Sequence, residues 1–111
     1  MRMMNLLTTS SQKIKKKIRE KKLSECSAFL FGSVLNSNKV NDIDALIIYK
    51  HKDLDIALDI RSELRTEFSK EGLKLDMLLL SEKEYQESKE TINWKMQKLS
   101  LTSIGEDSSE K

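Results

Sequence analysis

The sequence contains no proline, three glycines and a single cysteine, Cys26. One cysteine cannot form a disulfide within the chain, which favours a reducing compartment, and we expect a cytoplasmic protein. The longest apolar runs, 45–49 and 77–80, are much shorter than the roughly 20 residues of a membrane-spanning helix, so no membrane association is expected. Residues 1–10 lack the apolar stretch of a secretory signal, and we expect none.

Length and composition fit one small domain. A chain of 111 residues provides one hydrophobic core. Hydrophobic residues make up 38% and charged residues 34% of the sequence, which is typical of a globular domain with both charge signs on its surface. We expect the domain to span residues 1–104 and a flexible polar tail to span 105–111. We therefore expect no separate substrate domain.

Positive charge is concentrated near the N-terminus. The net charge is +2, but residues 13–22 hold seven basic residues and one acidic residue. Such a strip either attracts phosphates or nucleic acid or forms the solvated face of an amphipathic helix with Ile14 and Ile18 inside. We favour the helix face, because the segment has no aromatic residue on which bases could stack, and expect at most weak, non-specific nucleic-acid contact.

Hydrophobic periodicity predicts alternating helices and strands. Ser81 and Glu84 form a capping-box pattern at the start of the last helix. The second and third strands are apolar on both faces, which predicts a covered sheet. The fold class is therefore α/β (α+β), a single domain with a mixed sheet of three to four strands flanked by helices. Helices are expected at about 9–22, 54–69 and 82–99, and strands at 27–31, 43–49 and 73–80.

Three aspartates interrupt the apolar pattern of the two central strands. Asp42 and Asp44 lie two residues apart and share a strand face, and Asp76 lies inside the next strand. If the strands are neighbours, the carboxylates converge and repel one another, and hard divalent cations such as Mg²⁺ relieve that repulsion. Two ions about 3.5–4 Å apart suit a phosphoryl displacement. Alternatively, Asp42 lies in a turn, Asp44 caps a strand and Asp76 pairs with a lysine.

Gly32 and Ser33 follow the first strand. A glycine at that position lets the backbone approach a ligand closely, because there is no Cβ. The free N–H groups of a following short helix and the serine hydroxyl can hold phosphate oxygens. An anion-binding turn beside a metal site is the arrangement of a nucleoside triphosphate pocket.

The order Gly-Ser, spacer, Asp-x-Asp and later strand aspartate resembles the DNA polymerase β nucleotidyltransferase superfamily. The likeness spans about residues 27–80 and is greatest to the minimal nucleotidyltransferases, which include the antitoxin partners of HEPN-domain toxins. Two features depart from the family pattern. The spacer after Ser33 has only eight residues, and the basic signature that often follows Gly-Ser is replaced by Val34-Leu35-Asn36.

The resemblance implies a polymerase β-like fold and assigns roles to matching positions. By this likeness, Gly32 and Ser33 bind the triphosphate, Asp42 and Asp44 hold two Mg²⁺ ions, and Asp76 completes the metal site and helps to activate the acceptor hydroxyl.

We therefore expect an Mg²⁺-dependent nucleotidyltransferase, an enzyme that moves AMP from ATP to a hydroxyl and releases pyrophosphate. The resemblance favours a protein acceptor and a role in a toxin–antitoxin pair, with RNA or a small molecule left open. A partner chain or a second copy would complete the pocket. Two alternatives are a catalytically silent module that neutralises a partner by contact, and a nucleic-acid-binding domain that uses residues 13–22.

Overall fold

The structure is a computed structural model that describes residues 5–23, 25–37, 39–91 and 95–101. The expected tail at 105–111 lies outside the described residues. In chain order the elements are α1 (Leu6–Glu20), β1 (Cys26–Phe31), the 3-10 helix η1 (Gly32–Leu35), β2 (Asp42–Tyr49), the 3-10 helix η2 (His51–Asp53), α2 (Leu54–Ser69), β3 (Lys74–Ser81), α3 (Glu82–Ser88) and β4 (Met96–Lys98).

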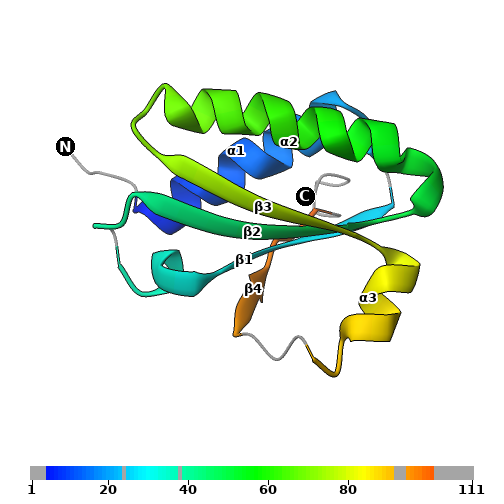
Figure 1. Cartoon of the computed structure of the whole chain (residues 1–111). Helices are drawn as coiled ribbons and strands as arrows, with labels where there is room; N and C mark the ends of the chain where they lie inside the picture. Colours follow the sequence, from blue (N-terminus) through cyan, green and yellow to red (C-terminus); the bar gives the residue numbers. More distant parts are fainter. Residues whose placement is uncertain (1–4, 24, 38, 92–94, 102–111) are drawn as a thin grey trace, which may run out of the picture.

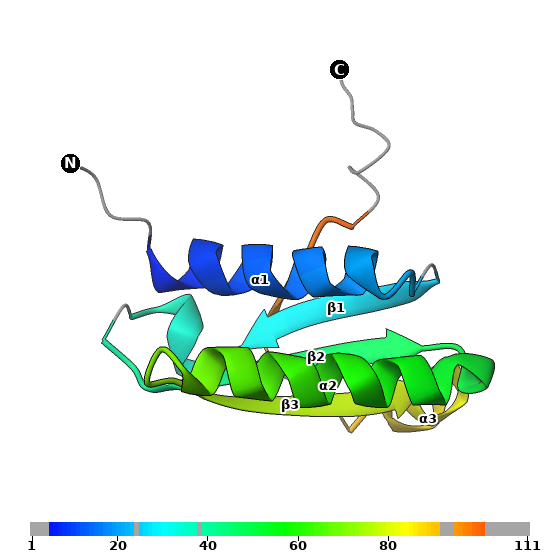
Figure 2. The same ribbon diagram turned by 90° about the horizontal axis from the view of Figure 1, so that it is seen from above.

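The described strands form one mixed sheet in the order β3-β2-β1-β4. Strand β1 pairs antiparallel with both β2 and β4, whereas β2 and β3 are parallel and are joined through α2. Helices α1 and α2 lie side by side over the same face of the sheet (Figures 1 and 2). The predicted α+β class and mixed sheet are confirmed.

The core lies between this sheet face and the two helices. Ile14 from α1 and Leu64 and Phe68 from α2 are fully buried against Leu30 and Ile47 of the sheet. Full burial of one such side chain contributes roughly 1.5–3 kcal/mol. The packing of α1 and α2 across the sheet therefore helps to hold the central strands in place.

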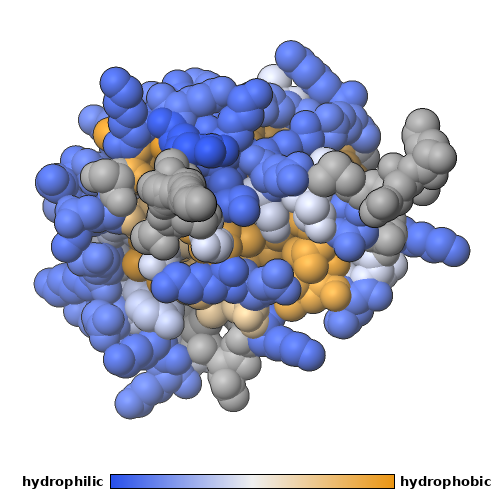
Figure 3. Space-filling model, turned by 180° about the vertical axis from the view of Figure 1, so that it is seen from behind, coloured by the Kyte–Doolittle hydropathy of each residue, from blue (hydrophilic) through white to orange (hydrophobic). Residues whose placement is uncertain are grey.

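The other face of the sheet is covered only in part. Leu46 and Ile48 of β2 are buried there, outside the main core, but Leu78 of β3 is 39% exposed. The short helix α3 lies on this side, opposite α1 and α2 (Figure 1). The prediction of two covered faces thus holds for β2 and is wrong for β3. Seen from behind, the surface is mostly hydrophilic, and its largest group of apolar side chains lies near the middle of the view, with smaller groups elsewhere (Figure 3).

Helix α1 begins earlier than expected. Its N-cap is Asn5, whose side-chain oxygen accepts a hydrogen bond from the Thr8 N–H at 2.7 Å. The predicted caps at 9–11 lie inside the helix, because Leu6 and Leu7 pack against the core and extend the apolar face by a turn. Asparagine caps a helix as well as serine does, so the residue types alone do not decide the start.

The last predicted helix, 82–99, is wrong at 89–91 and 95–99, and its residues 92–94 lie outside the described residues. The capping box is present, with Ser81 and Glu84 exchanging hydrogen bonds, but α3 ends at Ser88. Residues 96–98 instead form β4, and the N–H of Leu99 donates to the carbonyl of Ala28 at 2.8 Å. This segment pairs with the free edge of β1 and supplies backbone partners that a helix would not have provided.

The basic strip at 13–22 is a helix face that contacts α2. The Lys17 Nζ lies 2.6 Å from Glu67 Oε2 and 3.1 Å from Glu63 Oε1. These hydrogen bonds raise the pKa of Lys17 above its ordinary value. Further ion pairs, on these helices and just beyond their C-termini, join Lys13 to Glu71, Lys17 to Glu20 and Lys21 to Glu63. The predicted helix and its inward-facing Ile14 and Ile18 are confirmed, whereas Lys17 of the basic strip is buried against α2 and is not solvated. In the described part of the chain no helix is long and apolar enough to cross a membrane.

Candidate functional site

Asp44 and Asp76 occupy paired positions on the parallel strands β2 and β3. Paired residues on neighbouring strands point to the same face, and the strands lie roughly 4.8 Å apart. Asp42 lies two residues before Asp44 and shares that face, on the side of the sheet opposite α1 and α2. The structure therefore brings the three predicted aspartates together at one end of the sheet.

The electrostatics of Asp44 reflect this arrangement. Burial raises the pKa of Asp44, and the charges of Asp76 and then Asp42 raise it further. No lysine, arginine or histidine in the described residues lies within 4 Å of any of the three carboxylates. Lys74 pairs with Asp42 in the strand register but forms no ion pair with it. The alternative in which a lysine neutralises Asp76 is therefore wrong for the residues that the structure describes.

The three carboxylates do not form a closed cation site. Within the described ranges, no three acidic, histidine or cysteine side chains are close enough together to hold a metal ion as they stand. Asp42 and Asp76 are exposed, whereas Asp44 is half-buried. A half-buried carboxylate beside two others and without a cationic partner fits Mg²⁺, which prefers hard oxygen ligands. Asp42 and Asp76 are free to turn their carboxylates toward such an ion.

The Gly32–Ser33 turn packs directly against Asp44. Gly32 opens η1 with a φ of +79°, which only glycine adopts cheaply. A Cβ added at Gly32 would collide with Oδ2 of Asp44 and lie 3.3 Å from its Cγ. This contact follows from the pairing of Phe31 with Asp44 at the end of β1. The predicted phosphate-binding turn and the predicted acidic cluster therefore touch.

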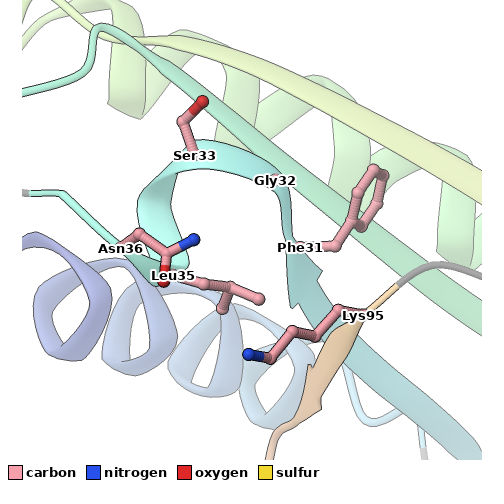
Figure 4. Close-up of a pocket in the computed structure, with 6 residues that line it drawn as sticks. All are labelled: Phe31, Gly32, Ser33, Leu35, Asn36 and Lys95. Carbon is pink, nitrogen blue, oxygen red and sulfur yellow. The ribbon is translucent and has the colours of Figure 1, made fainter.

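A cavity of about 500 Å³ lies beside this turn (Figure 4). Apolar side chains and two polar ones line it together with the turn itself. Lys95 extends from the start of β4 toward Leu35, and the Ser33 hydroxyl points away from Lys95 (Figure 4). The lining residues are Phe31, Gly32, Ser33, Leu35, Asn36 and Lys95. Sequence reasoning missed Lys95, because it assigned that residue to the last helix.

Cys26 is not a candidate nucleophile. Burial, and secondarily the charge of Asp53, raise the pKa of its thiol to about 11. A thiol with a raised pKa holds almost no thiolate at neutral pH, and the thiolate is the reactive form. Its sulfur instead lies 3.8 Å from the carbonyl of Leu23.

One solved structure shares this architecture. No protein-family model matches the chain, and no curated protein matches it. A crystal structure described as that of a "putative nucleotidyltransferase" superposes with a TM-score of 0.52 over 85% of this chain and 97% of its own. The two sequences are 22% identical, so the likeness concerns the fold alone. The chain thus shares a small α+β fold with that structure.

Proposed function

We propose that this chain is a nucleotidyltransferase whose three aspartates hold Mg²⁺, two ions in the complete site. The Gly32–Ser33 turn binds the phosphates of ATP or another nucleoside triphosphate. One observation carries the proposal: Asp44 is paired with Asp76 across the parallel strands and lies against Gly32. Transfer of a nucleotidyl group needs cation ligands close to a phosphate-binding turn. Asp44 supports this arrangement, because it is paired with Asp76 and also contacts Gly32.

The roles of the side chains follow from their positions. When bound, Mg²⁺ supplies positive charge to the phosphate oxygens at the reacting phosphorus. Asp42 and Asp44 hold the ions, and Asp76 accepts the proton of the acceptor hydroxyl. The acceptor oxygen forms a bond to the α-phosphorus while the bond from that phosphorus to the bridging oxygen breaks, and pyrophosphate leaves. Ser33 donates its hydroxyl to a phosphate oxygen, which fixes the triphosphate before transfer.

The acceptor that we propose is a hydroxyl of a protein, and the group transferred is AMP. The resemblance to the antitoxin branch supports this choice. So does the partly open sheet face beside the aspartates, where Leu78 is 39% exposed and leaves room for a second chain. We place this activity in the cytoplasm, as the antitoxin of a toxin–antitoxin pair.

The alternative is a binding module that neutralises a partner by contact alone. In this alternative the partner would contact the partly open sheet face around Leu78, which is 39% exposed. A catalytic site, unlike a contact surface, depends on the charge of Asp44.

The test is transfer of label from ATP carrying radioactive phosphorus at the α-position into protein, with and without Mg²⁺. Replacing Asp42 and Asp44 by asparagine should lower incorporation by about 10³-fold, since charged ligands at the reacting phosphate are lost. Asp59→Asn on the exposed side of α2 removes a carboxylate far from the site and should transfer normally. If the double variant labels protein as fast as the parent, these aspartates are not the catalytic site.

A further inference from the structure

Strand β4 brings a lysine to the predicted phosphate-binding turn. Phe31 of β1 pairs with Met96 of β4, so the next position outward sets Gly32 across from Lys95. Both residues line the same cavity of about 500 Å³ (Figure 4). The two come from distant parts of the chain and meet only because β4 closes the sheet along β1.

Lys95 is the charged side chain of this lining. The cavity wall is otherwise made of Phe31, Leu35, the turn and the amide of Asn36. In the described ranges Lys95 has no acidic group within 4 Å, in contrast to Lys13 and Lys17 of α1 and to its C-cap residue, Lys21. An ammonium without a carboxylate partner, beside apolar walls and an amide, is suited to an anion.

The alternation of β4 explains why Lys95 is left unpaired. Met96 shares the sheet face of its partner Phe31, which is also the face of Asp44. Lys95 directly precedes the strand, and its side chain points away from that face, toward Leu35 (Figure 4). This separation keeps the ammonium away from the aspartates, which would otherwise form an ion pair with it. The Gly32 backbone lies between Asp44, on one face of the sheet, and Lys95, on the other.

We infer that Lys95 binds the outer phosphates of the nucleoside triphosphate, the part that leaves as pyrophosphate. The inference rests on the proposed function and deepens it. The aspartates would hold the cation at the α-phosphate, and the chain of phosphates would pass Gly32, where no side chain obstructs it. The three residues after Ser33 are Val34, Leu35 and Asn36, so the turn itself supplies no positive charge. Lys95 supplies it from β4.

The test compares binding of ATP and AMP, each with Mg²⁺, by calorimetry on the whole chain. Lys95→Met keeps most of the side-chain length and removes the charge. It should weaken ATP binding by about 10–100-fold, as expected for one charged hydrogen bond, and leave AMP binding unchanged. Lys95→Arg should retain the ATP affinity. Lys98→Met is the matched control, because it removes the same charge from the same strand but lines other cavities.

The outcomes separate this inference from the proposed function. If the parent binds neither Mg·ATP nor Mg·AMP, the proposed function fails and the inference fails with it. If the parent binds Mg·ATP and Lys95→Met binds it equally well, only the role of Lys95 is overturned. Equal weakening of ATP and AMP would also overturn it, because the lysine would then not distinguish the outer phosphates.

Discussion

Gly32 lies against the carboxylate of Asp44, so that a single added carbon at residue 32 would collide with Oδ2. The backbone of Gly32 has a φ of +79°, so the position demands glycine for two separate reasons. One reason is conformational and the other is steric. At Gly72, the second glycine with positive φ in the described residues, only the conformational reason applies.

Replacing each glycine by alanine separates these two effects. Gly72 has a φ of +78° and nothing within 4 Å of an added Cβ. Gly72→Ala should lower the free energy of unfolding by about 1–2 kcal/mol through backbone strain alone. Gly32→Ala carries the same strain and also displaces Asp44, so it should be less stable still and should lose Mg·ATP binding. Urea unfolding and calorimetry measure both. Equal stability and equal binding in the two variants would show that the Asp44 contact is unimportant.

Asp44→Asn should make the protein more stable at pH 7. The folded state raises the pKa of Asp44, mainly by burial and then through Asp76 and Asp42. A raised carboxyl pKa means that the ionised form costs stability above that pKa, and the cost disappears below the ordinary value of about 3.9. The advantage of the asparagine variant in urea unfolding should therefore shrink as the pH falls from 7 toward 4. A variant less stable than the parent at pH 7 would mean that the carboxylate is stabilised in the absence of metal.

Ser33→Ala tests the hydroxyl of the turn without disturbing the three aspartates proposed as metal ligands. It should weaken ATP binding by about 10–150-fold, the effect of one hydrogen bond to a charged oxygen. Binding of Mn²⁺, followed by relaxation enhancement, should be nearly unchanged, because the three aspartates are intact. Ser62→Ala, exposed on α2, serves as the control. If Ser33→Ala binds Mg·ATP like the parent, the hydroxyl takes no part in phosphate binding.

Lys17→Met tests the ion pairs between α1 and α2. The side chain of Lys17 is buried, whereas Glu63 and Glu67 are 44% and 40% exposed. The loss in unfolding free energy should therefore be about 1–2 kcal/mol, between that of an exposed and a buried pair. Lys16→Met, on the exposed side of α1, should cost much less.

The pH dependence of that loss has a definite sign. The pKa of Lys17 is raised and that of Glu63 is lowered, so both contributions are fully present between about 4.3 and 10.4, the ordinary values for glutamate and lysine. The difference between Lys17→Met and the parent should be constant across that window. It should fall at lower pH, where the glutamates become protonated, and a difference that grows in acid would contradict the assignment.

The central part of the fold could be predicted from the sequence because its signals are local. The bounds expected for the second helix, 54–69, are those observed for α2, and the capping box of Ser81 and Glu84 is present. The last helix failed at residues 96–99, where apolar spacing fits a helix or a strand. The segment forms a strand because it pairs with the free edge of β1, a long-range partner that no local pattern reveals.

The candidate site divides in the same way. Asp42, Asp44 and Asp76 could be placed on one face because strand alternation is a local rule and only the pairing of β2 with β3 had to be assumed. Lys95 could not be found, because its position beside Gly32 depends on β4. The contact between Gly32 and Asp44 was also beyond prediction, since it depends on the register of β1 against β2.

The pairing of Asp44 with Asp76 has a consequence for the rate at which the chain folds. These strands are parallel and joined through α2, so their pairing closes a long loop and is slow by nature. It also brings two negative charges together before any cation is held between them. The barrier to folding should thus contain an electrostatic part that divalent cations or neutral substitutions reduce, so that refolding is faster in Mg²⁺ than in its absence.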